Sequence, residues 1–126
     1  MSEELKEFEI FKHNLLIKLL DKGFTPVTAI RPHGEVIEYI KGYISVYLGN
    51  YISIVETKQN VFAEIRIKKN TLYIKYQIID NYVDAEISFK KFIQNKTTEE
   101  FANALANDGV INTVKQLINN INAYLD

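Results

Sequence analysis

Two turn sequences in the second half of the chain, at residues 69–70 and 80–81, constrain its fold more than any other feature. If Lys-Asn at 69–70 is a two-residue turn, Ile65 lies opposite Ile74 on one face of a hairpin. If Asp-Asn at 80–81 is the next turn, the same apolar face continues with Ile87 opposite Ile74. Two independent turns that give one consistent apolar face predict three antiparallel strands. We expect these strands near residues 61–68, 71–79 and 82–90.

The opposite face of the same three strands is polar and equally consistent. Arg66 lies opposite Tyr73, and Lys75 lies between Glu64 on one side and Glu86 on the other. Opposite charges directly across neighbouring strands stabilise a sheet, so this pairing supports the register. The sequence therefore predicts a sheet with one buried face and one face that meets solvent.

The segment before residue 60 is also rich in β-branched and aromatic residues, but it leaves two arrangements open. Residues 35–48 form either one long strand with a bulge at Gly42, or two strands that meet at a Lys-Gly turn at 41–42. Glu38 lies on the apolar face in the first arrangement only. At Gly49 and Asn50 a three-residue loop preserves the alternation better than a two-residue loop. The whole segment between residues 25 and 92 is predicted to be a meander of five or six strands.

A helical spacing of apolar residues precedes the strands. Leu5, Phe8 and Leu15 belong to a stripe that recurs at three- and four-residue steps from Ser2 onward. We expect this helix to end near residues 21–22, because Gly23 suits a left-handed C-terminal cap.

A second helical pattern follows the strands. Thr97 and Glu100 have the spacing of a capping box, and the apolar stripe begins at Phe101. Gly109 interrupts the stripe, which resumes at Val110, so this region is one kinked helix or two short ones. The predicted fold class is therefore α+β, a single domain over residues 1–126 in which the antiparallel sheet packs with an N-terminal and a C-terminal helix.

Composition excludes several classes of function. The chain has no cysteine, so it forms no disulfide and has no thiolate nucleophile or cysteine-ligated metal. Its formal net charge is −1, which does not fit a dedicated binder of duplex nucleic acid. Its N-terminal residues are acidic, unlike a signal peptide, and its apolar stretches are too short to cross a bilayer. We therefore expect a cytoplasmic protein without membrane attachment.

Few residues suggest catalysis. His13 and His33 are the only histidines, and neither has the neighbours of a metal ligand or a catalytic base. Arg31 and His33 flank a Pro-containing turn and form a candidate anion-binding pair. Glu38 would be a candidate acid or base only if it faced the core, where burial raises a carboxyl pKa. We expect no enzyme activity, no cofactor and no metal.

The polar face of the sheet is the strongest candidate for a binding site, because it interleaves aromatic and basic residues. The residues expected to contact a partner are Tyr43, Tyr47, Tyr51, Arg66, Lys68, Tyr73 and Lys75. Tyrosine and arginine are frequent at the centres of protein interfaces, so the first hypothesis is a regulatory protein that binds a protein partner. Amphipathic helices also favour a homodimer.

Two alternatives remain at this stage. The same aromatic and basic face is typical of proteins that stack the bases of single-stranded nucleic acid. A cavity between the sheet and the C-terminal helix, lined by Tyr39, Tyr76 and Phe89, would instead suit a carrier of a small apolar ligand. The abundance of Ile, Lys, Asn and Tyr indicates an AT-rich genome, which fits an accessory or inhibitory protein of a virus or mobile element.

Overall fold

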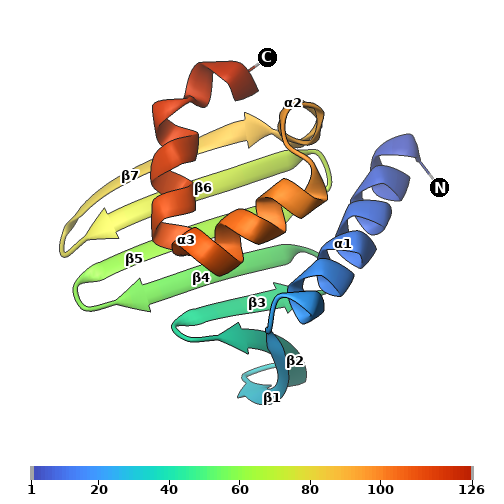
Figure 1. Ribbon diagram of the computed structural model, residues 1–126, viewed down its shortest axis with the longest axis vertical. Helices are drawn as coiled ribbons and strands as arrows, with labels where there is room; N and C mark the ends of the chain where they lie inside the picture. Colours follow the sequence, from blue (N-terminus) through green and yellow to red (C-terminus); the bar gives the residue numbers. More distant parts are fainter. Residues whose placement is uncertain (1, 126) are drawn as a thin grey trace.

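The computed structural model describes residues 2–125 and has an N-terminal helix, a seven-stranded antiparallel sheet and a C-terminal helical segment (Figure 1). The strands occur in the sheet in the same order as in the chain, from β1 at one edge to β7 at the other. The prediction of an α+β meander is confirmed, but the number of strands is seven and not five or six. The strands are β1 (Thr25–Arg31), β2 (Gly34–Lys41), β3 (Ile44–Leu48), β4 (Ile52–Lys58), β5 (Val61–Lys68), β6 (Thr71–Ile78) and β7 (Asn81–Ser88).

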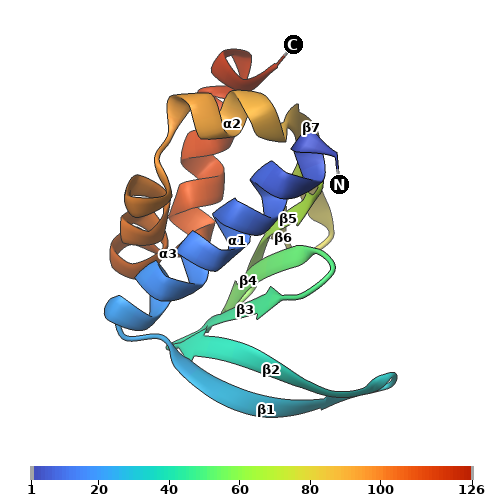
Figure 2. The ribbon, with the colours of Figure 1, turned by 90° about the vertical axis from the view of Figure 1, so that its right-hand side faces the viewer.

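The helices all lie on one face of the sheet, which we call the inner face, and no helix formed by residues 2–125 lies on the other, outer face (Figure 2). Helix α1 (Glu3–Asp21) precedes the sheet, and α2 (Phe89–Asn95), α3 (Thr98–Asn119) and the 3-10 helix η1 (Ile121–Tyr124) follow it. The hairpin of β1 and β2 projects beyond the helical layer and bends away from it (Figure 2). The sheet therefore has one covered face and one open face.

The core lies between the inner face of the sheet and the helices. Apolar side chains alternate along the central strands, and the inward ones are fully buried, as at Ile54, Ile65 and Ile74. These three residues also lie opposite one another on neighbouring strands. Burial of each such side chain stabilises the fold by about 1.5–3 kcal/mol.

Aromatic rings join the three helices at one end of the core. The ring of Phe11 on α1 meets that of Phe89 on α2 edge-on, with centroids 5.2 Å apart. The ring of Phe92 on α2 meets that of Phe101 on α3 in the same way, at 5.1 Å. Edge-to-face contacts of this kind add to the free energy of burial, so the short helix α2 is fixed between its longer neighbours.

The ends of α1 and α3 follow the predicted capping sequences. Helix α1 ends at Asp21, and Gly23 has a φ of 96°. The N–H of Gly23 donates to Leu20 and that of Phe24 donates to Leu19, which is a Schellman motif. The capping box of Thr97 and Glu100 is also present.

Segment α3 consists of two helices that meet at a kink at Gly109, so the structure agrees with the second of the two alternatives for this region. Gly109 has φ 85° and ψ 167°, a conformation that interrupts the helix. The carboxylate of Glu56 on β4 accepts a hydrogen bond from the N–H of Ile111 at 2.8 Å. It thereby caps the second half of α3, where free N–H groups and the helix dipole favour a negative charge.

The predicted register is right for β5 with β6 and wrong for β6 with β7. Strands β5 and β6 pair around the turn at 69–70 as expected. The next turn occupies residues 79–80, one residue earlier than predicted, so Ile74 faces Ala85 and not Ile87. Lys75 consequently faces Asp84 instead of Glu86. The shift equals two residues in the partner strand, which keeps every side chain on its predicted face.

Two further expectations require correction. Strand β7 ends at Ser88, whose side chain caps α2, so the strand does not extend to residue 90 and Phe89 is a helical core residue. Residues 35–48 form two strands that meet at a turn at 42–43, one residue later than the alternative anticipated. The three-residue loop at 49–51 is confirmed.

Candidate functional site on the outer face of the sheet

The outer face presents a continuous row of side chains that crosses six strands. Each member lies directly opposite the next, because the strand registers align them. In order from β2 to β7 the row contains Glu38, Tyr47, Ser53, Arg66, Tyr73 and Glu86. The neighbouring row, from β3 to β7, contains Ser45, Val55, Glu64, Lys75 and Asp84. Since no helix covers these rows, they form a surface available to a partner.

The structure brings most of the predicted contact residues together on this surface. Tyr47 points outward from β3, and the ring of Tyr51, in the loop after it, lies 5.1 Å from the Tyr47 ring between centroids. The ammonium of Lys68 lies 5.7 Å from the centroid of the Tyr51 ring. Tyr43 is separate, because it lies in the turn at the other end of β3 and contacts Lys58 instead. The aromatic surface therefore begins at Tyr47 and not at Tyr43.

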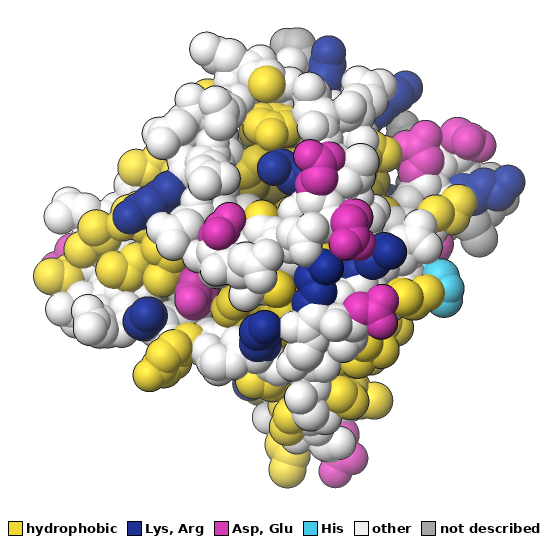
Figure 3. All heavy atoms as spheres, in the orientation of Figure 1, with side chains coloured by type: hydrophobic (Ala, Val, Ile, Leu, Met, Phe, Trp, Pro, Cys, Tyr) yellow, Lys and Arg dark blue, Asp and Glu magenta, His cyan; other side chains and the backbone are white. Residues whose placement is uncertain are grey.

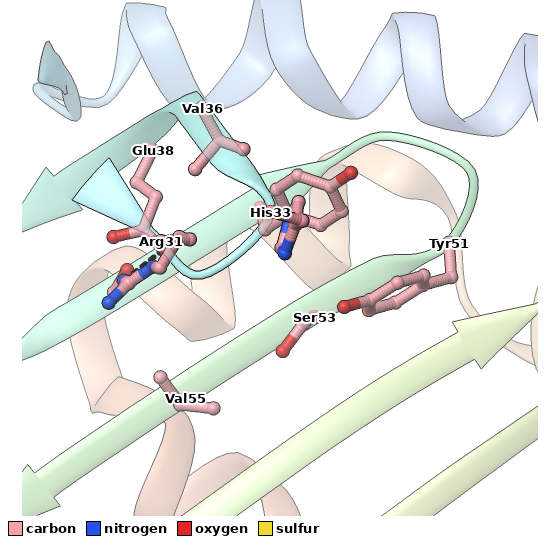
Figure 4. A pocket seen from close by; sticks show the side chains of 9 residues that line it. Arg31, His33, Val36, Glu38, Tyr51, Ser53 and Val55 are labelled. Atoms are coloured by element: carbon pink, nitrogen blue, oxygen red, sulfur yellow. Dashed lines mark hydrogen bonds and ion pairs between the residues drawn. The ribbon is translucent and has the colours of Figure 1, made fainter. Parts of the chain in front are cut away.

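One hollow on this face lies where the β1–β2 hairpin meets β3 and β4 (Figure 4). It has a volume of about 290 Å³, and Tyr51 and Ser53 lie on one side of it. On the opposite side Arg31 forms an ion pair with Glu38. The hydrogen bond and the charge of Glu38 raise the pKa of Arg31 above its ordinary value.

This ion pair changes what Arg31 and His33 offer to a ligand. His33 lines the same hollow as Arg31, so the two predicted anion-binding residues do share a site. The guanidinium of Arg31 is already paired with the carboxylate of Glu38, however, so an anion that binds Arg31 would have to compete with Glu38. Glu38 points to the outer face, so the arrangement in which it faced the core is wrong, and with it the basis for an acid or base at this position.

Another hollow on the outer face lies over β5, β6 and β7 and has a volume of about 380 Å³. Its floor contains Glu64, whose side chain is only 10% exposed although no helix covers it. A guanidinium nitrogen of Arg66 lies 2.8 Å from the carboxylate of Glu64, and the guanidinium also lies 6.0 Å from the centroid of the Tyr73 ring. Arg66 therefore covers the carboxylate and contacts an aromatic ring at the same time.

Tyr73 connects this hollow to the β7 edge. Its hydroxyl donates a hydrogen bond of 3.1 Å to the carboxylate of Asp84. Partial burial raises the pKa of Tyr73, and the hydrogen bond and charge of Asp84 raise it further. On the same edge the ammonium of Lys75 lies 5.0 Å from the centroid of the Tyr82 ring.

The outer face carries as many cations as carboxylates. The outward cations of the strands are Arg31, Arg66, Lys68 and Lys75, and the outward carboxylates are Glu38, Glu64, Asp84 and Glu86. Both arginines are in ion pairs, and both lysines lie over tyrosine rings. The face therefore combines aromatic area with local charge balance.

Other candidate sites received less support from the geometry. His13 is exposed on α1. Within residues 2–125, no three His, Cys, Asp or Glu side chains gather closely enough to hold a metal ion. Tyr39 and Tyr76 pack against the core, and Phe89 is buried within it. None of the helices described has the length and apolar character needed to span a membrane.

Sequence reasoning placed Glu64 and Glu86 on the polar face but missed the roles of Glu38 and Asp84. Glu38 would have been assigned to the outer face if the turn after β2 had been chosen over the bulge. Asp84 lies on the outer face in both registers, but the predicted turn, one residue too late, paired Lys75 with Glu86 instead of Asp84. The alternation of β2 gave no signal for Glu38, because Glu38 shares its parity with the apolar residues Val36 and Ile40. Nothing in the alternation of β7 distinguishes the two registers.

Comparison with known proteins does not assign this surface. No protein-family model, curated protein or solved structure matches the chain.

Proposed function

We propose that this chain is a non-enzymatic binding protein that recognises a protein partner through the outer face of its sheet. The observation that carries the proposal is the balance of charge across an aromatic surface that no helix covers. Arginine and tyrosine account for much of the binding energy at protein interfaces, and here Arg66 and Tyr73 lie side by side at the centre of the cross-strand row.

Local neutralisation favours a protein partner over nucleic acid. A surface that binds phosphates needs cations whose charge is free to replace counterions. Arg66 and Arg31 are each paired with a glutamate, so they contribute little net positive potential. A partner with a mixture of polar and aromatic groups meets this face without leaving a buried charge unpaired.

A second candidate function rests on one corner of the face. Tyr47, Tyr51 and Lys68 form a group of two rings and one ammonium that is free of ion pairs within residues 2–125. Such a group is able to stack unpaired bases and contact a phosphate. Binding of single-stranded nucleic acid is therefore the alternative that the experiment must separate from protein binding.

The composition and the lack of a catalytic constellation suit a cytoplasmic accessory or inhibitory protein of a virus or mobile element. In that role the outer face would occupy a surface of a larger protein and block or redirect it.

The experiment is site-specific photo-cross-linking in cells that naturally contain the protein. A benzophenone amino acid replaces Tyr73 in one variant and Tyr47 in another, and it replaces Asn112, which is exposed on α3, in the control. We expect protease-sensitive adducts from the two outer-face positions and none from the control. Adducts that nuclease removes would support the alternative, and adducts of equal yield at all three positions would contradict both.

A matched pair of charge changes tests the alternative directly. Arg66→Glu with Lys68→Glu removes two outer-face cations, whereas Lys90→Glu with Lys115→Glu removes two exposed cations elsewhere. If single-stranded nucleic acid is the partner, a fluorescent oligothymidine should bind the wild type with a steep dependence on salt, and only the first pair should abolish binding. We expect no salt-dependent binding by the wild type.

A further inference from the structure

We propose that two copies of the chain associate through strand β1, which pairs antiparallel with β1 of a second copy about a two-fold axis at Thr28. The proposal concerns an edge of the sheet and not its outer face, so it does not depend on the function proposed above. It would join the two sheets into one continuous sheet.

Strand β1 is an unprotected edge. The sheet is open, so β1 and β7 each have one side without a strand neighbour. From Thr25 to Ile30 the strand has no charged residue, and six of its seven residues are exposed. Natural sheets usually protect such edges with charges or short strands, and an edge that lacks them is a template for pairing.

The opposite edge shows the protection that β1 lacks. Strand β7 carries Asp84 and Glu86, and η1 packs near it. A two-fold pairing of β7 centred on either carboxylate would place that group opposite its own copy, and like charges directly opposite each other destabilise a sheet. Charge therefore selects β1 over β7 as the edge that accepts a second copy.

The backbone of β1 is arranged for pairing. The two-residue turn at 32–33 closes on the pair of Arg31 and Gly34, so alternate residues from Arg31 backwards bond to β2. The N–H and C=O groups of the residues between them, Thr28 and Ile30, therefore point to the free edge. The backbone of Pro26 also points to the free edge. Proline has no N–H, so at this position its missing donor removes no hydrogen bond between β1 and β2.

The side chains of β1 are complementary to their own copy. A two-fold axis at Thr28, the midpoint of the strand, places Val27 opposite Ala29 of the second copy and Pro26 opposite Ile30 of the second copy. Each pair is apolar, and no charged side chain meets another of the same sign. Ile30 is 81% exposed in the single chain, which is the highest exposure among its large exposed apolar residues.

The hairpin itself needs such a neighbour. Strands β1 and β2 bend away from the helices, so the outer part of the hairpin has no layer packed against it (Figure 2). Hydrophobic atoms reach the surface where this hairpin projects at the lower end of the molecule (Figure 3). A two-stranded ribbon without a packed face is only marginally stable in water, and pairing with a second hairpin makes it four-stranded.

The test uses opposite charges at the two-fold axis. Wild type, Thr28→Lys and Thr28→Glu are examined by sedimentation velocity over a range of concentrations up to about 100 μM. We expect the wild type to approach twice the chain mass of 14.6 kDa, and each variant alone to remain at 14.6 kDa. An equimolar mixture of the two variants should recover the dimer, because lysine then lies opposite glutamate. Val83→Lys on the exposed side of β7 is the control and should behave as the wild type.

Each other result overturns the proposal. A wild type that stays at 14.6 kDa excludes the second copy as the occupant of this edge. A Thr28→Lys variant that still dimerises, or a mixture that does not, excludes this axis. Because Thr28 is exposed, circular dichroism of the variants should match the wild type, which separates loss of association from loss of folding. Outer-face cross-linking is measured independently, so either proposal can fail alone.

Discussion

Replacement of Gly109 by alanine should destabilise the protein strongly, and the structure indicates two separate causes. The backbone at Gly109, with φ 85° and ψ 167°, lies in a region that is essentially restricted to glycine, which costs a side chain about 1–3 kcal/mol. The new Cβ would also lie 2.9 Å from a carboxylate oxygen of Glu56. That oxygen accepts the hydrogen bond from Ile111, and loss of a hydrogen bond to a charged group costs about 1.5–3 kcal/mol. We therefore expect Gly109→Ala to lower the free energy of unfolding by about 2.5–6 kcal/mol.

A double-mutant cycle with Glu56→Ala separates the two causes. In the Glu56→Ala background the collision and the hydrogen bond are already absent, so Gly109→Ala should cost only the backbone strain, about 1–3 kcal/mol. Urea denaturation followed by circular dichroism gives all four free energies, because a small single domain usually unfolds in one transition. If the two substitutions are additive, the carboxylate does not contact position 109 and the account of the kink is wrong. If Gly109→Ala costs less than about 1 kcal/mol, the strained backbone itself is refuted.

Three further predictions concern the core, the capping box and the outer face. Ile65→Ala should lower the free energy of unfolding, measured by urea denaturation, by about 2–5 kcal/mol, because Ile65 is fully buried. Ile30→Ser on the exposed hairpin is the control and should change it by about 0.5 kcal/mol or less. Equal effects of the two substitutions would contradict the placement of the core. Hydrogen bonds from the N-cap of α3 lower the pKa of Glu100, so its contribution to stability is present above the ordinary glutamate pKa of about 4.3 and is lost as the pH falls through the lower folded value. Glu100→Gln should remove this part of the acid sensitivity of the urea midpoint, and an unchanged pH profile would argue against the capping box. In Gly49→Ala the new Cβ would lie 2.1 Å from the hydroxyl oxygen of Tyr47, so the ring must move, and the tyrosine signal in near-ultraviolet circular dichroism should change while the unfolding midpoint changes little.

The parts of the fold that were predictable are those in which two requirements agree. The turn at 69–70 was correct because its register satisfies an apolar face and a polar face together. The turn at 80–81 satisfied the same two requirements and was still wrong, since a shift of two residues leaves both faces unchanged. Tertiary packing distinguishes the two registers, because Phe89 belongs to α2, where its ring packs on that of Phe11. The cost is a left-handed φ of 54° at Ile79, a β-branched residue for which that conformation is unfavourable.

The face of the sheet that each site residue occupies could be predicted wherever the strand itself was predicted correctly. Arg66, Tyr73 and Lys75 were placed correctly because parity alone determines their face. Tyr43 was misplaced because a residue in a turn has no face, and the turn at 42–43 was not distinguished from a bulge. The faces of β1 could not be assigned from the sequence, because a strand that is exposed on both sides has no alternation of apolar and polar residues.

The strand order of the sheet has a kinetic consequence. Every pair of adjacent strands is also adjacent in the chain, so the sheet can form by successive local hairpins with short loops. The contact between α1 and α3 is different, because the ion pair of Lys22 with Glu99 joins residues 77 positions apart. Closing that long loop has an entropic cost that no early hairpin offsets. We therefore expect folding to be limited by the docking of the two chain ends over a sheet whose hairpins have already formed.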